Sequence, residues 1–124
     1  MKFRYRFLVL YFALAVQTGL AQNTYVPDDN FEQALIDLGY DDTLDDYVVT
    51  DSISSVTSLD VENQEISDLT GIEGFTALTT LDCQGNQLTS LDVSANTALT
   101  SLECYSNQLT SLDVSANTAL TYLY

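Results

Sequence analysis

The chain has no histidine or tryptophan, and its three basic residues, Lys2, Arg4 and Arg6, all lie within the first six positions. Without that segment, the remaining sequence would carry all 18 acidic residues and no basic residue. Such a chain has no side chain that could neutralise phosphate, which excludes nucleic-acid binding. Docking of a basic patch on an anionic membrane is excluded for the same reason.

The residues that usually carry enzymatic chemistry are also scarce. General acid–base catalysis near neutral pH draws mainly on histidine, or on a lysine or carboxylate held in a dry pocket. The sequence has no G-x-S-x-G elbow, P-loop or H-E-x-x-H motif. A glycosidase needs two carboxylates that flank a cleft, and Asp82 and Glu103 are expected on an open surface. We therefore predict a protein that is not an enzyme and has no resident cofactor.

Residues 1–21 have the pattern of a secretory signal peptide. The basic segment MKFRYR is followed by the apolar run FLVLYFALAV, which is short for a membrane-spanning helix. Gly19 and Ala21 supply the small residues that a cleavage site after Ala21 requires. We expect this segment to be removed on export, with no membrane insertion afterwards. The mature chain is then expected to be secreted or held at the cell surface.

Residues 56–124 are organised by a repeat. Leu78, Leu99 and Leu120 recur every 21 residues, and the copies that begin at Leu78 and Leu99 follow the frame L-x-x-L-x-C-x-x-N-x-L. Apolar and polar residues alternate at the start of each copy, as in a strand with one buried face. A single strand of this kind leaves its apolar face exposed, whereas stacked copies bury a continuous core. We predict coils over residues 56–77, 78–98 and 99–119, and a partial coil over residues 120–124.

Asparagines mark the turns of these coils. Asn86 and Asn107 stand at equivalent positions, where an amide that both donates and accepts can satisfy the turn backbone of neighbouring coils. The alternative is a solvated loop asparagine. The leucine pattern is echoed ten residues later and ends at Asn96 and Asn117. Each coil is therefore expected to have two extended sides and two asparagine turns.

Cys83 and Cys104 occupy the same inner position in neighbouring coils. Their side chains are expected to point the same way from adjacent parallel strands, which is poor geometry for a disulfide. Two thiols without histidine also make a poor metal site. Since free cysteine is among the most buried residue types, both are interpreted as core residues that replace a leucine of the repeat.

These units resemble the leucine-rich-repeat proteins, and more narrowly the secreted Bacteroidetes type with L-x-x-L-x-C-x-x-N-Q-L-T-S-L-D-V-S units. The first coil departs from the frame, because it has 22 residues and Gln64 stands where later coils have asparagine. Its segment Thr70–Phe75 is similar to internalin-like repeats, in which a short 3₁₀ turn forms the back of the coil. The resemblance implies a leucine-rich-repeat solenoid, mostly β, with stacked parallel strands in coils of 21–22 residues and an N-terminal helical cap.

Residues 22–55 precede the repeats and are expected to form that cap, since a terminal coil otherwise exposes its core end-on. A helix is predicted at about residues 29–38 from the spacing of its apolar residues. Phe31, Leu35 and Leu38 are expected on its packed face.

Short-range signals define the ends of the helix and the loop that follows. Asp28 or Asp29 can cap its start, and Gly39 can end it. The acidic run Asp41–Asp46 fails the calcium-loop pattern, because Asp46 stands where that loop requires glycine. We predict a solvated acidic loop, with incidental Ca²⁺ binding as the alternative.

The outward positions of the predicted strands form the candidate binding surface. Residues 78–98 and 99–119 differ at only four places, and three of these are outward positions of the first strand. Divergence there indicates either a ligand-facing surface or drift at unconstrained sites. The candidate ligand-binding residues are Ser58, Asp60, Glu62, Thr80, Asp82, Gln84, Ser101, Glu103, Tyr105 and Tyr122.

This surface is acidic, rich in hydroxyl groups and ends in tyrosines. Such a surface suits a basic protein partner, or a glycan that stacks on aromatic rings. Like charges at strand spacing repel each other, so a cation such as Ca²⁺ could relieve the ladder of Asp60, Asp82 and Glu103. We predict a secreted or cell-surface module that mediates protein–protein interaction or adhesion.

The alternative is a structural spacer, or the N-terminal part of a longer surface protein, without a ligand of its own. The sequence stops at Tyr124, part-way through a further coil. We expect either that the protein continues beyond this point or that something covers the open end. A second copy of the chain could do so by self-association.

Overall fold

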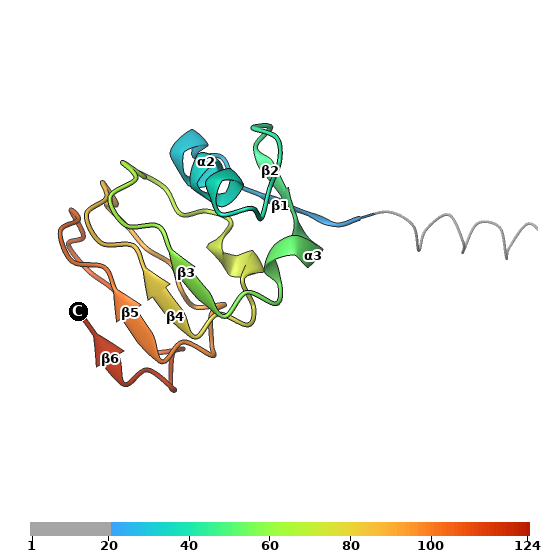
Figure 1. Ribbon diagram of the computed structural model, residues 1–124. Helices are drawn as coiled ribbons and strands as arrows, with labels where there is room; N and C mark the ends of the chain where they lie inside the picture. Colours follow the sequence, from blue (N-terminus) through green and yellow to red (C-terminus); the bar gives the residue numbers. More distant parts are fainter. Residues whose placement is uncertain (1–20) are drawn as a thin grey trace, which may run out of the picture.

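The computed structural model describes residues 21–124, so the predicted signal peptide lies outside the described residues apart from Ala21. A small N-terminal unit leads into stacked coils whose strands form a four-stranded parallel sheet (Figure 1). Within residues 21–124, no helix is long and apolar enough to cross a membrane. The elements are β1 (Asn23–Tyr25), α2 (Asp29–Asp37), β2 (Tyr47–Val49), α3 (Thr50–Ile53), β3 (Ser58–Asp60), a 3₁₀ turn (Ile72–Gly74), β4 (Thr80–Asp82), β5 (Ser101–Glu103) and β6 (Tyr122–Leu123).

The leucine spacing sets the register of the sheet. Leu59 pairs with Leu81, Leu81 with Leu102, and Leu102 with Leu123, in strict parallel order. The first three of these side chains are almost fully buried, and each stabilises the fold by about 1.5–3 kcal/mol relative to an exposed leucine. The predicted stack of parallel strands is therefore present, with one strand in each coil.

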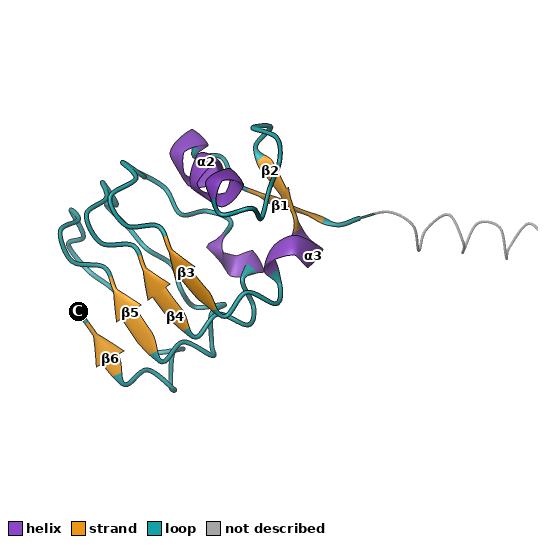
Figure 2. Cartoon of the chain, viewed as in Figure 1, coloured by secondary structure: helices purple, strands orange, loops and turns teal. Residues whose placement is uncertain are grey.

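The second side of each coil is less regular than expected. Figure 2 shows the segments between the strands of the four-stranded sheet mostly as loop, and each strand of that sheet is only two or three residues long. Leu88 and Val93 are buried on the second side, but no strand forms there. The solenoid thus contains more turn than the description mostly β implies. The short 3₁₀ turn predicted for the back of the first coil is observed at Ile72–Gly74.

Asp28 joins helix α2 to the first coil. Its Oδ1 atom accepts hydrogen bonds from the backbone N–H groups of Asn30 and Phe31, both at 3.0 Å. Its Oδ2 atom accepts from the N–H groups of Ser67 and Asp68, at 2.9 and 3.0 Å. An N-cap side chain normally satisfies only the start of its own helix. Here the same carboxylate also bonds to the backbone of Ser67 and Asp68, which lie 39 and 40 residues further along the chain.

Helix α2 is shorter than its apolar pattern indicates. Phe31 and Leu35 are buried, but Leu38 is 47% exposed, so the prediction that all three share the packed face is wrong for Leu38. The physical reason is the end of the helix, because Leu38 is the C-cap residue and Gly39 has a φ of +85°. This left-handed conformation ends the helix and leaves Leu38 outside the core.

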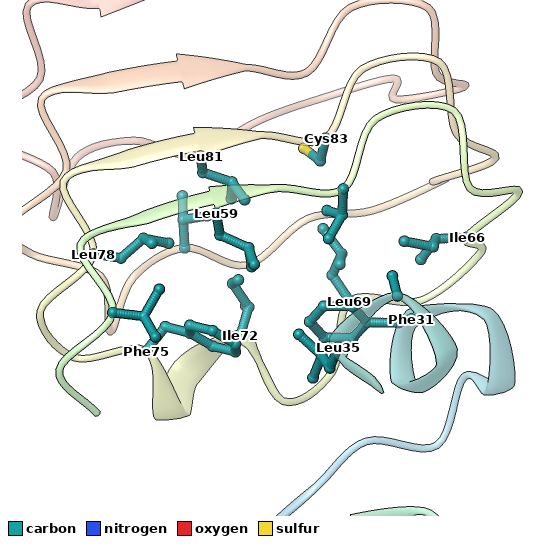
Figure 3. Packing of buried hydrophobic residues seen from close by; sticks show 14 of the residues in the cluster. Phe31, Leu35, Leu59, Ile66, Leu69, Ile72, Phe75, Leu78, Leu81 and Cys83 are labelled. Atoms are coloured by element: carbon teal, nitrogen blue, oxygen red, sulfur yellow. The ribbon is translucent and has the colours of Figure 1, made fainter. Parts of the chain in front are cut away.

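The apolar core continues from the N-terminal unit into the coils. Figure 3 shows Phe31 and Leu35 next to Leu69, at one end of a cluster that extends through Ile72 and Phe75. The ring centroids of Phe31 and Phe75 lie 6.4 Å apart. The apolar face of helix α2 therefore packs against apolar side chains of the first coil.

Glu32 is completely buried, which the amphipathic pattern of the helix does not predict. Its Oε1 atom accepts hydrogen bonds from the N–H groups of Asp45 at 2.8 Å and Tyr47 at 3.2 Å, and Oε2 accepts from that of Asp46 at 3.0 Å. The side chains of the run Asp41–Asp46 are mostly exposed, as predicted for a solvated loop. The end of its backbone, however, is anchored on Glu32.

Candidate binding surface

All ten residues proposed from the sequence lie on or directly after the four parallel strands, in three columns across the sheet. Strand register places the members of the first two columns side by side, and backbone hydrogen bonds after β6 add Tyr124 to the second. Backbone hydrogen bonds that continue beyond β3 and β4, from Asn63 N to Gln84 O and from Gly85 N to Tyr105 O, align the third. The columns are Ser58, Thr80, Ser101 and Tyr122; Asp60, Asp82, Glu103 and Tyr124; and Glu62, Gln84 and Tyr105.

Tyr124 belongs to this surface although the sequence analysis does not include it. The signal was available, because Tyr124 lies two residues after the outward-facing Tyr122 and side chains alternate along a strand. Its backbone continues the ladder, since Tyr124 N–H donates to the carbonyl of Leu102 and Cys104 N–H donates to the carbonyl of Tyr124. Tyr124 is 64% exposed.

In the first two coils, an amide group relieves the repulsion between carboxylates. Asp60, Glu62 and Asp82 each offer an oxygen within 4.8 Å of the other two. The Nε2 atom of Gln84 donates to Glu62 Oε2 at 2.8 Å and to Asp82 Oδ2 at 3.0 Å. Because these donors already lie between the carboxylates, the cluster has a partner for its charge without a metal ion. Ca²⁺ binding at the ladder of Asp60, Asp82 and Glu103 stays a prediction.

The third coil has a different arrangement, because Tyr105 stands where the second coil has Gln84. The ring centroids of Tyr105 and Tyr124 are 4.9 Å apart at an interplanar angle of 88°, an edge-to-face pair. The rings of Tyr122 and Tyr124 are nearly parallel, with centroids 6.3 Å apart. Desolvation, together with the nearby carboxylates of Glu103 and Asp82, raises the pKa of the Tyr105 phenol. The aromatic and acidic parts of the surface are therefore contiguous.

Asn86 organises the turn beneath this surface. Its Nδ2 atom donates to the carbonyls of Val61 at 2.9 Å and Cys83 at 3.0 Å. Its Oδ1 atom accepts from the N–H groups of Gln64 and Ile66, both at 3.0 Å. The side chain is only 4% exposed. One buried amide thus satisfies backbone groups of its own coil and of the coil before it.

The other turn asparagines follow the same plan with fewer bonds. Asn107 Nδ2 donates to the carbonyls of Cys83 and Cys104, and Asn107 Oδ1 accepts from Leu88 N–H, all at 3.0 Å. Asn96 and Asn117 donate to carbonyls of the preceding coil on the second side. Their Oδ1 atoms are buried and accept no hydrogen bond from a residue in the part of the chain that the structure describes.

Cys83 and Cys104 are both buried with free thiols. Burial raises the pKa of Cys83 to about 12, with smaller contributions from Cys104 and Asp82. Burial also raises the pKa of Cys104, which is 8% exposed where Cys83 is fully buried. The geometry places both side chains in the core, where a thiol behaves as a small apolar group.

We expect the two thiols to differ in reactivity toward iodoacetamide at pH 8. A thiol with a pKa of about 12 is almost entirely protonated at that pH, and the thiolate is the reacting species. Cys104 should therefore be alkylated before Cys83, and both more slowly than in urea. Mass spectrometry of a time course measures the order. Equal rates for both cysteines in native and unfolded protein would contradict their assignment to the core.

Carboxylates on the other side of the coils are engaged in local turns. A cavity of about 310 Å³ between the first and second coils is lined by residues that include Asp68, Glu73 and Asp92. Asp68 Oδ1 accepts from Thr70 N–H at 2.8 Å. Hydrogen bonds from Ser94 hold the pKa of Asp92 below its usual value. Asp92 is thus stabilised in its ionised form and Asp68 is bonded to the backbone, and neither arrangement suits a general acid.

Comparison with known proteins finds relatives for part of the chain. No protein-family model matches the chain. Internalin J of Listeria monocytogenes serotype 4b (strain F2365) and internalin J of serovar 1/2a (strain ATCC BAA-679 / EGD-e) are each 46% identical over 74 residues, which is 60% of this chain. The chain spans only 8% and 9% of the lengths of these two relatives.

Two solved structures are also similar. The functional domain of InlJ from Listeria monocytogenes, described as including a cysteine ladder, matches with a TM-score of 0.72 and 43% identity over 83% of this chain and 24% of that chain. The internalin InlF from strain 4b F2365 of the same species matches with a TM-score of 0.69 and 28% identity, over 81% of this chain and 30% of that chain. The chain is therefore a leucine-rich-repeat solenoid with parallel strands. The narrower resemblance to the Bacteroidetes type stays a prediction.

Proposed function

We propose that this solenoid is a secreted or cell-surface module that binds another protein through the outward face of strands β3 to β6. The observation that carries the proposal is the continuity of that face, on which carboxylates, hydroxyl groups and tyrosines from successive coils lie side by side. Solenoids present such extended surfaces to their partners. The similarity to internalins supports a role in protein interaction or adhesion.

Within this proposal, residues 22–55 act as the cap of the solenoid. The role is supported by the packing of Phe31 and Leu35 on the first coil and by the Asp28 carboxylate that joins α2 to Ser67 and Asp68. A cap of this kind covers the end of the core and leaves the outward side of the strands free to bind a partner.

Charge reversal on the face tests the proposal. We expect Asp82→Lys combined with Glu103→Lys to reduce adhesion of the producing cell, and of beads coated with the purified protein, by roughly tenfold or more. The matched control is Asp92→Lys with Asp113→Lys, which makes the same change in net charge on the second side of the same two coils. Circular dichroism establishes that both variants are folded.

The two arms separate a binding module from a spacer. If the face variant loses adhesion and the control keeps it, the sheet face is the binding surface. If both variants adhere like the original protein, the chain is a structural spacer or part of a longer surface protein whose ligand binds elsewhere. A loss that is equal in both variants would show that overall charge, and not this face, controls adhesion.

A calcium-stabilised adhesin is the second candidate. The three oxygens of Asp60, Glu62 and Asp82 that lie within 4.8 Å of one another support it, since Ca²⁺ prefers carboxylate ligands. The Gln84 amide that donates to two of these residues argues against it. A melting temperature that stays constant across millimolar Ca²⁺ would exclude this candidate.

A further inference from the structure

The second and third coils differ at the point where the surface changes character. In the second coil, the Gln84 amide donates to Glu62 and Asp82. At the equivalent place in the third coil, Tyr105 has no amide to offer. Within residues 21–124, the Glu103 carboxylate accepts no hydrogen bond from another side chain or backbone group. The replacement of glutamine by tyrosine therefore leaves one carboxylate of the ladder without a donor and places an aromatic ring beside it.

The aromatic group beside Glu103 is exposed and contiguous. Tyr105, Tyr122 and Tyr124 are 40%, 48% and 64% exposed. The backbone of Tyr124 runs beside Glu103, since Tyr124 N–H donates to Leu102 C=O and Cys104 N–H donates to Tyr124 C=O. The edge-to-face contact joins Tyr124 to Tyr105. A ring face carries partial negative charge at its centre. Rings and carboxylate thus present the same sign of potential to a group that approaches from solvent.

The residues that the structure describes contain no basic side chain that could pair with Glu103. All 18 acidic residues of the sequence lie outside its first 20 positions, whereas all three basic residues lie within its first six. The described residues therefore contain no lysine, arginine or histidine. Among residues 21–124, therefore, no side chain can supply a counter-charge for Glu103, whereas a mobile ion or a side chain of a partner can.

We propose that Tyr105, Tyr124 and Glu103 form a seat for an arginine side chain of a protein partner. The inference rests on the proposed protein-binding function of the sheet face and specifies the chemistry of the partner. A guanidinium group is planar, always charged and weakly hydrated, so it can stack on an exposed ring while its N–H groups donate to a carboxylate. A lysine ammonium is more strongly hydrated and offers no plane to stack. A neutral glycan leaves the charge of Glu103 uncompensated.

A short peptide pair tests the seat directly. The probe is acetyl-Gly-Ser-Arg-Ser-Gly-amide, and its control has citrulline in place of arginine, which keeps the shape of the side chain and removes its charge. In NMR titrations of the ¹⁵N-labelled protein, we expect the arginine peptide to bind roughly fivefold more tightly than the citrulline peptide. Ring currents should shift the arginine Hδ protons upfield, which attraction to a diffuse negative charge would not do. The lysine peptide should bind more weakly and show a smaller shift.

Matched variants locate the site. Tyr105→Gln installs the residue that the second coil tolerates at the equivalent place, so the fold should persist while the upfield shift disappears. Glu103→Gln and Asp113→Asn each remove one negative charge, the first beside the tyrosines and the second on the other side of the same coil. We expect only Glu103→Gln to weaken the arginine peptide by about fivefold.

Three results would contradict the proposal that these residues bind an arginine side chain. They are equal binding of the arginine and citrulline peptides, an equal effect of Glu103→Gln and Asp113→Asn, and binding of a neutral oligosaccharide such as chitohexaose at Tyr105 that is insensitive to Glu103→Gln. The last result would assign the tyrosines to a glycan. If any of these occurs while the charge-reversed face still abolishes adhesion, the binding module stands and only its partner chemistry is wrong. If adhesion is independent of the face, the proposed function fails whatever the peptides do.

Discussion

Replacing Asn86 by alanine is expected to lower the free energy of unfolding by about 4 kcal/mol. The amide is buried and bonds to backbone groups of two coils. Without it, Val61 C=O, Gln64 N–H and Ile66 N–H lose this partner, and each unsatisfied buried group destabilises a protein by about 1–3 kcal/mol. Small domains are stable by only about 5–15 kcal/mol. The variant should therefore unfold at a much lower urea concentration, measured by circular dichroism.

Asn107→Ala is the matched control for this prediction. Asn107 is less buried, and its Oδ1 atom accepts from one N–H group where Asn86 Oδ1 accepts from two. The carbonyl of Cys83 is shared, since both asparagines donate to it. We expect a loss of about 2 kcal/mol, roughly half that of Asn86→Ala. A loss below about 1 kcal/mol for Asn86→Ala would mean that water replaces the amide at this turn. Equal losses in the two variants would mean that the number of N–H groups bonded to Oδ1 does not set the loss.

Replacing Glu32 by alanine is expected to destabilise the protein by about 3 kcal/mol, and replacing it by glutamine by about 2 kcal/mol. Alanine leaves the N–H groups of Asp45, Asp46 and Tyr47 without their acceptor. Glutamine keeps one oxygen, which can accept from Asp45 and Tyr47. Its amide nitrogen then faces the N–H group of Asp46, so that two donors oppose each other.

Thermal unfolding and hydrogen exchange measure this effect. A loss of about 2 kcal/mol lowers the melting temperature of a small domain by roughly 10 °C, and Asp46 N–H should exchange faster in both variants. The control is Asp37→Asn, which removes a carboxylate from the exposed end of the same helix, where Asp37 accepts a hydrogen bond from the Gln33 side chain. Its effect should stay within about 0.5 kcal/mol. A Glu32→Gln variant as stable as this control would show that the loop is not held by Glu32.

The stacked sheet could be predicted because equivalent positions of successive repeats must pair with each other. Leucines at a constant spacing, such as Leu81 and Leu102, can be buried together only if neighbouring coils align. The outward surface then follows from the alternation of side chains along each strand. The sequence prediction of this surface ends at Tyr122, whereas the same alternation also places Tyr124 on it.

The parts that could not be predicted depend on single long-range contacts. Nothing in the periodicity of α2 distinguishes the buried Glu32 from an exposed helical glutamate, because its acceptors are satisfied by a loop that begins after the helix. The hydrogen bond from Ser67 N–H to Asp28 depends on how the first coil packs against helix α2, which the local sequence does not indicate. The exposure of Leu38 also cannot be predicted from spacing, because the apolar pattern continues for one residue after the helix has ended.

The turn asparagines give the solenoid a direction. The Nδ2 atoms of Asn86 and Asn96 reach carbonyls of the coil before them, and those of Asn107 and Asn117 do the same one coil later. Because Asn86 and Asn107 also accept hydrogen bonds from backbone N–H groups of the preceding coil, each coil is fully bonded only after its successor has docked on it. A chain that emerges from its N-terminus during synthesis or export meets these requirements in order. Stepwise completion of the stack, in which each new coil satisfies the backbone of the one before it, thus follows from the placement of one amide side chain per turn.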